Sequence, residues 1–335
     1  MNHSPRCAAA AALIGPAFAV QAPRAGAAQL ETLVVDVAAQ SPYPTYRAPP
    51  LVVDFVGANG VGLPFNGLPV GGLPGIERGA TSFTGPWLDS ASVTGTGDSS
   101  FGLWSGAGSS SANAAYGRVG AAGAGTMAGF SDGNTVVGFE AAALFSDSFT
   151  VADPLPKGQR GIAVLHFGVD GSLSVSGSSG AAVYANYRQG DGPVFTLKSA
   201  TIQGGSSTFY GGLGSGASGY VVTPTSIGGS GVFDTQPLEL TFGSAFDLTF
   251  GVFAYAIPRR GGADSSFGST APLTGIDIFD QFGQWVDDFT IASASGTRYG
   301  AHGVEVAAVP EPTTTALLGT GLAAMLAAWR KRRPR

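Results

Sequence analysis

The chain has 335 residues, enough for one large or two ordinary domains, and only 12% of them are charged. Its 53 glycines and 21 prolines favour turns over long helices, and its single cysteine, Cys7, excludes an intramolecular disulfide. Setting aside the two cations before residue 28, the five after residue 329 and Glu311, ten basic and 21 acidic residues remain, a net charge of −11. A body this acidic repels nucleic acid and anionic membranes.

Residues 1–27 have the features of an export leader. Arg6 and the terminal amine give a thin positive region, and an apolar run of small residues follows from Ala8 to Ala19. Two small-residue cleavage sites lie at 17–19, at the end of this run, and at 25–27. We therefore expect a signal peptide over 1–27, although a disordered alanine-rich leader has a similar composition.

Residues 28–79 read as an arm rich in Pro and Gly with short strands. The runs 33–37 and 51–56 are apolar enough for strands, and the proline-punctuated stretch 41–50 between them is extended. Leu-Pro pairs then recur at 63, 68 and 73 beside several glycines, which excludes a helix there. This arm is either a solvated linker or a proline-rich ligand for a partner.

Residues 80–306 form the predicted body, which we expect to be all-β. Residues 90–129 are rich in Ser, Gly and Ala, as in flat exposed strands without helical periodicity. Between the strand-like runs 162–169 and 172–176, Asp170-Gly171 has the composition of a type I′ hairpin turn.

The second half of the body has the clearest strand pattern. Alternating apolar residues over 238–242 and 246–252 predict two strands with a corner or bulge at 243–245. A looser region after residue 258 holds further strands at 276–279, 288–291 and 304–306. About ten short strands in total predict an antiparallel β-sandwich or jelly roll.

Residues able to support catalysis are few. The body holds two histidines, His166 and His302, and strand alternation places His166 on the solvent face, opposite Leu165 and Phe167. The sequence contains no histidine pair with metal spacing and no phosphate loop. We therefore expect no enzymatic activity and no cofactor.

Two groups of side chains remain as candidates for binding. The first is the densest acidic group, Asp277, Asp280, Asp287 and Asp288. These carboxylates could bind calcium, supply a glycosidase pair or form a solvated acidic rim. The aromatic residues that could stack on sugar rings, or simply fill a β core, are Trp87, Trp104, Trp285, Tyr116, Tyr210 and Tyr299.

The chain ends in three successive features. A rigid Pro-Glu-Pro at 310–312 precedes an uncharged stretch over 313–329, and this is followed by a basic cluster of Arg330, Lys331, Arg332, Arg333 and Arg335. The uncharged stretch would span roughly 26 Å as a helix, close to the bilayer core of about 30 Å. Because cations after a span stay in the cytoplasm, the body lies on the far side of the membrane. A plain membrane anchor would have the same hydropathy and charges.

This arrangement resembles the PEP-CTERM sorting signal of Gram-negative, exopolysaccharide-producing bacteria. The resemblance rests on Val309, Pro310, Glu311 and Pro312, the apolar residues 317–322 and the basic residues 330–333, under a tenth of the chain. It implies that an integral membrane protease, the exosortase, recognises the Pro-Glu-Pro region and removes the tail. The precursor would be anchored in the inner membrane, facing the periplasm, and the product would reach the cell surface or the extracellular space.

Three hypotheses follow for the body. The first is a non-catalytic surface or matrix protein associated with exopolysaccharide and biofilm. The second is a secreted carbohydrate-binding module. The third is a polysaccharide hydrolase that uses a carboxylate pair.

Overall fold

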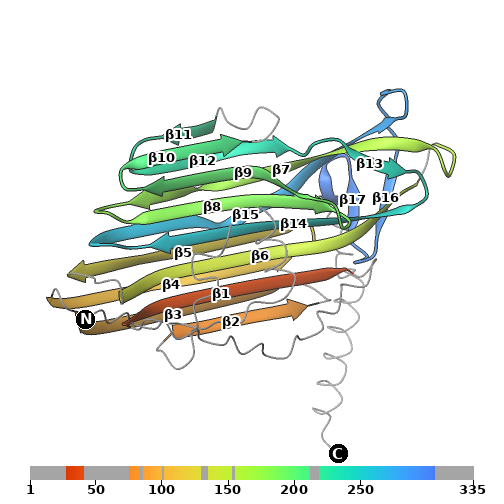
Figure 1. Ribbon diagram of the computed structural model, residues 1–335. Helices are drawn as coiled ribbons and strands as arrows, with labels where there is room; N and C mark the ends of the chain where they lie inside the picture. The colour runs from red at the N-terminus through yellow and green to blue at the C-terminus, as the bar shows by residue number, and fades with distance from the viewer. Residues whose placement is uncertain are drawn as a thin grey trace, which may run out of the picture.

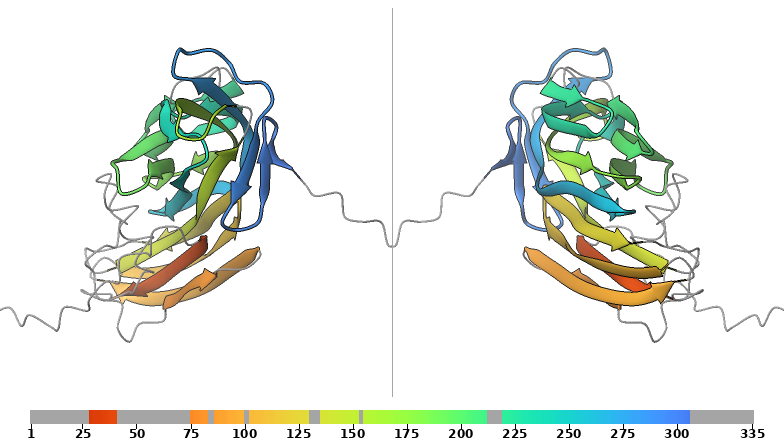
Figure 2. Two further views of the ribbon diagram at one scale, coloured as in Figure 1. Left: turned by 90° about the vertical axis from the view of Figure 1, so that its right-hand side faces the viewer. Right: turned by 90° about the vertical axis from the view of Figure 1, so that its left-hand side faces the viewer.

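The computed structural model describes residues 28–40, 75–82, 86–99, 102–129, 135–152, 155–211 and 219–305. This part of the chain is all-β, and two curved antiparallel sheets face each other with the outline of a half-barrel (Figure 1, Figure 2). The predicted all-β, antiparallel class is confirmed. In these ranges no helix is long and apolar enough to cross a bilayer. The predicted leader, most of the arm and the tail lie outside the described residues.

Ten strands form the first sheet: β1 (Gln29–Gln40), β2 (Gly75–Ser82), β6 (Thr135–Ala152), β8 (Gly180–Gln189), β9 (Val194–Gln203), β10 (Ser206–Gly211), β14 (Ala245–Ile257), β16 (Thr290–Ser293), β17 (Arg298–Gly300) and β18 (Gly303–Glu305). Their order is β10-β9-β8-β14-β6-β16-β17-β18. The long strand β6 pairs with β14 on one side, and β1 and β16 follow each other along its other side. β2 pairs with β1.

Eight strands form the second sheet: β3 (Trp87–Ser99), β4 (Gly102–Ala115), β5 (Arg118–Gly129), β7 (Arg160–Val175), β11 (Tyr220–Val222), β12 (Ser226–Asp234), β13 (Leu238–Thr241) and β15 (Gly261–Asp280). Their order is β11-β12-β7-β15-β5-β4-β3, and β13 pairs with β7 beyond the end of β12. The predicted corner at 243–245 is confirmed. It carries the chain from β13 in the second sheet to β14 in the first.

The core between the sheets is aromatic at one end and built on small residues at the other. Phe167 of β7 stacks on Phe250 of β14, with ring centroids 3.8 Å apart. Towards β4 and β5, the buried ring of Phe139 from β6 fills the space over Gly108 and Gly125, where added Cβ atoms would overlap it. The Ser, Gly and Ala stretch therefore forms strands that a large ring can approach closely.

The hairpin predicted at Asp170-Gly171 is wrong. β7 continues through both residues and pairs with β12 and β15. Gly171 has a φ of 152°, and a Cβ there would overlap the ring of Phe267 and the carbonyl of Ser266 in β15. This glycine permits a close approach between strands, so the chain does not reverse.

Other segments differ from the expectation in extent. The region after residue 258, expected to be looser, is mostly the 20-residue strand β15. The expected strands at 288–291 and 304–306 correspond to β16 and β18. β1 contains the predicted strand 33–37 and pairs with β6 along its length, which joins it to the first sheet. The division of the chain into domains stays a prediction.

Candidate functional site

The sorting residues Val309, Pro310, Glu311 and Pro312 and the basic cluster at 330–335 lie outside the described residues, which end at 305. The candidate sites in the body can be placed. They are the acidic group, the aromatic residues, His166 and two concave surfaces.

The structure assigns separate roles to the four aspartates. Asp280, at the end of β15, accepts hydrogen bonds from the backbone N–H groups of Phe282 and Gln284, each at 2.8 Å, and so closes a turn. Asp287 and Asp288 are exposed in the following loop. Within the described ranges no three His, Cys, Asp or Glu side chains form a group that could hold a metal ion. Only Asp277 lies in a cluster of interacting side chains.

That cluster consists of His166 between two carboxylates. The Nδ1 atom of His166 lies 2.7 Å from Oδ1 of Asp234, and Nε2 lies 3.1 Å from Oδ2 of Asp277. Burial alone would lower the pKa of His166, but the hydrogen bonds and charges of the two aspartates outweigh it and raise that pKa. The solvent-face prediction for His166 is confirmed, since Leu165 and Phe167 on the opposite face are buried. With both ring nitrogens occupied, His166 holds the carboxylates in place.

The chain that follows Asp234 is fixed to both sheets. Thr235 donates its N–H to the carbonyl of Leu165 at 2.9 Å, and its Oγ1 accepts the N–H of Leu165 at 3.0 Å. The N–H of Gln236 donates to the hydroxyl of Tyr187 in the first sheet at 2.7 Å. Residues 234–236 are therefore held rigidly where the two sheets meet.

A pocket of about 340 Å³ opens beside this segment. Its aromatic residues are Tyr187, Phe195 and Tyr210, and its polar residues are Thr196, Ser199, Asp234 and Gln236. The rings of Tyr187 and Phe195 are stacked, with centroids 5.5 Å apart and planes 24° apart. Tyr210 on the edge strand β10 is 56% exposed. The pocket thus has an aromatic wall and several hydrogen-bonding groups, and its one charged residue is Asp234.

The other predicted aromatic candidates are distributed between core and surface. Trp104 and Tyr299 are buried, and Tyr116 packs half-buried against the core. Trp285 is 61% exposed beside Phe279 and is not among the residues that line the pocket. The side chain of Trp87 lies outside the described residues. Among the five whose side chains are described, Tyr210 is the one that lines the pocket.

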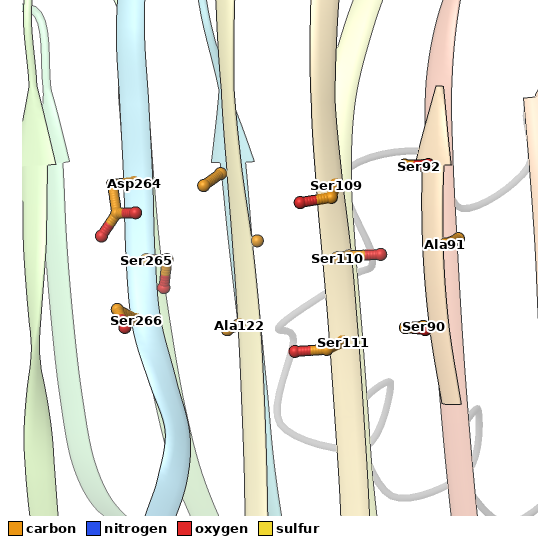
Figure 3. Close-up of a pocket in the computed structure, with 12 residues that line it drawn as sticks. Ser90, Ala91, Ser92, Ser109, Ser110, Ser111, Ala122, Asp264, Ser265 and Ser266 are labelled. Carbon is orange, nitrogen blue, oxygen red and sulfur yellow. The ribbon is translucent and has the colours of Figure 1, made fainter. Parts of the chain in front are cut away.

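The second concave surface is a shallow groove of about 590 Å³ across β3, β4, β5 and β15 (Figure 3). Small and hydroxyl side chains line it, and its one carboxylate is Asp264, whose pKa is raised by burial. No histidine, lysine, arginine or cysteine is among the residues that line the groove, and the hydroxyl of Ser110 donates to the buried carboxylate of Asp36.

Comparison with known proteins identifies the tail. A family model of the PEP-CTERM protein-sorting motif matches residues 308–333. This motif marks a membrane-anchored, exported precursor that an exosortase processes and sorts to the cell surface. No curated protein matches the sequence.

A match among solved structures is the crystal structure of the KRT10-binding region domain of the pneumococcal serine rich repeat protein PsrP. The sequence identity is 10%, the match covers 64% of this chain and 88% of that one, and the TM-score is 0.16. A TM-score this low supports no conclusion about function.

Proposed function

We propose that this chain, which carries a PEP-CTERM sorting motif at residues 308–333, is a non-catalytic surface or matrix protein associated with exopolysaccharide and biofilm. The motif is the observation that carries the proposal. In it, residues 1–27 are a signal peptide and residues 313–329 span the inner membrane as a helix. The cluster at 330–335 stays in the cytoplasm while the body faces the periplasm. An exosortase then removes the tail.

The body supports binding better than catalysis. We propose that it is a β-sandwich, and that it needs neither a metal nor a cofactor. His166 has both nitrogens engaged by carboxylates, and no histidine or lysine is among the residues that line the groove. A carbohydrate-binding module is the second candidate, favoured by the aromatic pocket. No observation in the described residues favours the hydrolase.

Replacing residues 310–312 by three alanines tests the sorting proposal. Since the exosortase is expected to recognise this segment, the variant should keep its tail and stay with the membrane, while the wild-type chain loses it. Intact mass spectrometry of both proteins from the native host measures the difference. A matched control replaces residues 313–315, three threonines, by alanines, which keeps the Pro-Glu-Pro. Loss of the tail from the 310–312 variant as from the wild type would mean that Pro-Glu-Pro is not the recognised segment, and a tail retained by both would mean that it is only an anchor.

A further inference from the structure

The pocket beside Asp234 suggests a ligand class. We propose that it binds one ring of a neutral polysaccharide, with Tyr210 as the stacking residue and Asp234 as the hydroxyl acceptor. This deepens the proposed function by naming the partner of the displayed body.

The shape of the pocket fits a single sugar ring. Its volume of about 340 Å³ is near the lower end of the roughly 300–1,000 Å³ range of small-molecule sites. A pyranose has an apolar C–H face that packs on an aromatic ring and a rim of hydroxyl groups that need hydrogen-bond partners. Tyr210 is exposed on the edge strand β10 and offers such a ring at the pocket mouth.

The hydrogen-bonding groups are complementary to hydroxyls. The Tyr187 hydroxyl accepts the N–H of Gln236 and keeps its own proton to donate, although its side chain is 2% exposed. Oδ1 of Asp234 is bonded to His166, which leaves Oδ2 to accept a hydroxyl proton from a ligand. The Gln236 carboxamide both donates and accepts. Sugar hydroxyls also donate and accept hydrogen bonds. They match this mixture of groups better than a ligand that has only donors or only acceptors.

Charge selects among the sugars. Two carboxylates, those of Asp234 and Asp277, flank the single imidazole of His166, so the cluster is net negative whether or not the ring carries a second proton. No lysine or arginine lines the pocket, and the whole body is acidic. A uronic acid would therefore be repelled, while a neutral hexose meets no such cost.

The protein groups that would bind the sugar are held in position before the ligand arrives. Asp234 is held by His166, which Asp277 holds in turn, and the next two residues are bonded to opposite sheets. A site whose groups are already ordered loses less entropy on binding. The rigid segment 234–236 therefore supports recognition of a ligand without rearrangement.

The test is glycan binding by the purified full chain in detergent solution. An array carrying neutral hexose oligosaccharides, amino sugars and uronic-acid oligosaccharides is probed first, and the best ligand is then titrated by calorimetry. We expect binding to neutral hexoses and none to uronic acids. Tyr210→Ala and Asp234→Asn should each weaken binding about tenfold, and Trp285→Ala, an exposed aromatic outside the pocket, should leave it unchanged.

Four results would overturn the inference: no glycan bound at millimolar concentration, preference for uronic acids, full affinity in Tyr210→Ala, or a loss confined to Trp285→Ala. Tyr210 is on the surface, so an unchanged thermal midpoint of its variant separates lost binding from lost folding. Because sorting is read from the mass of the chain in its host, a negative glycan result leaves the proposed function standing on its own test.

Discussion

Replacing Lys198 by methionine is expected to raise the free energy of unfolding by about 2–4 kcal/mol at pH 7. Lys198 has no exposed surface, and its Nζ has no hydrogen-bond partner. Burial lowers its pKa to about 6, against a smaller opposite effect of the Asp170 charge. Methionine keeps the unbranched length and fills the same space without a group that needs solvation.

Two effects oppose each other at this lysine. The Nζ atom lies 3.4 Å from the ring centroid of Tyr220 and 4.7 Å from that of Phe267, and such rings attract an ammonium group. That attraction contributes about 2 kcal/mol or more, whereas a pKa lowered from 10.5 to about 6 corresponds to roughly 6 kcal/mol against the charged form. Desolvation outweighs this attraction, so the pKa of Lys198 stays below its ordinary value.

The lowered pKa of Lys198 makes the stability of the wild-type protein depend on pH. Between pH 6 and 10.5 the unfolded chain binds one proton that the folded chain does not bind at Lys198. Wild-type stability therefore rises with pH through this window, by up to about 1.4 kcal/mol per unit. The advantage of the methionine variant should be largest near pH 6 and shrink towards pH 10. Urea denaturation across this range measures it.

Lys157→Met is the matched control, because Lys157 is exposed. Its variant should unfold like the wild type at every pH. A methionine variant at 198 that is less stable than the wild type, or whose advantage does not change with pH, would mean that the ammonium is charged and held by the aromatic rings.

Replacing Gly125 by valine is expected to cost about 3 kcal/mol or more of stability. The ring of Phe139 occupies the place of a side chain at Gly125, and Phe139 is fully buried. Added carbons must displace either that ring or the backbone of β5, because cores are close-packed. Urea denaturation of the purified chain measures the loss.

A double-mutant cycle shows whether Phe139 is the cause. In the Phe139→Ala background the valine at 125 has room, so the two losses should sum to more than the double variant loses. Ala107→Val, on an exposed position of the neighbouring strand β4, is the control and should change little. Strictly additive losses would contradict the packing described for Phe139.

The fold class could be predicted, but the strand paths could not. Alternating apolar residues and abundant glycine predicted an all-β fold, and 18 strands are described where about ten were expected. β10, with the sequence Ser206 to Gly211, has little apolar alternation and depends on its partner β9. Asp170-Gly171 has the sequence of a turn, yet its pairing with Gly229 and Ser230 of β12 holds it extended. Tertiary pairing therefore overrides local preference.

The candidate site could not be predicted from local sequence patterns either, because its residues come together only when the strands pair. Asp234 is 68 residues from His166, and no spacing rule joins them before the strands pair. Asp277 was singled out for its acidic neighbours, whereas its partner is a histidine on another strand. Lys198 should face solvent by alternation with Leu197, but a bulge opposite Ala185 and Asn186 turns it into the core.

The most direct test of sorting is the mass of the wild-type protein recovered from the cell surface and the medium of its native host. If an exosortase processes this chain, the product lacks the basic residues 330–335 and the preceding apolar stretch, with a C-terminus in or near residues 309–312. Peptide mapping of the surface fraction should then find no peptide from 330–335. A surface protein that retains this tail intact would contradict the account.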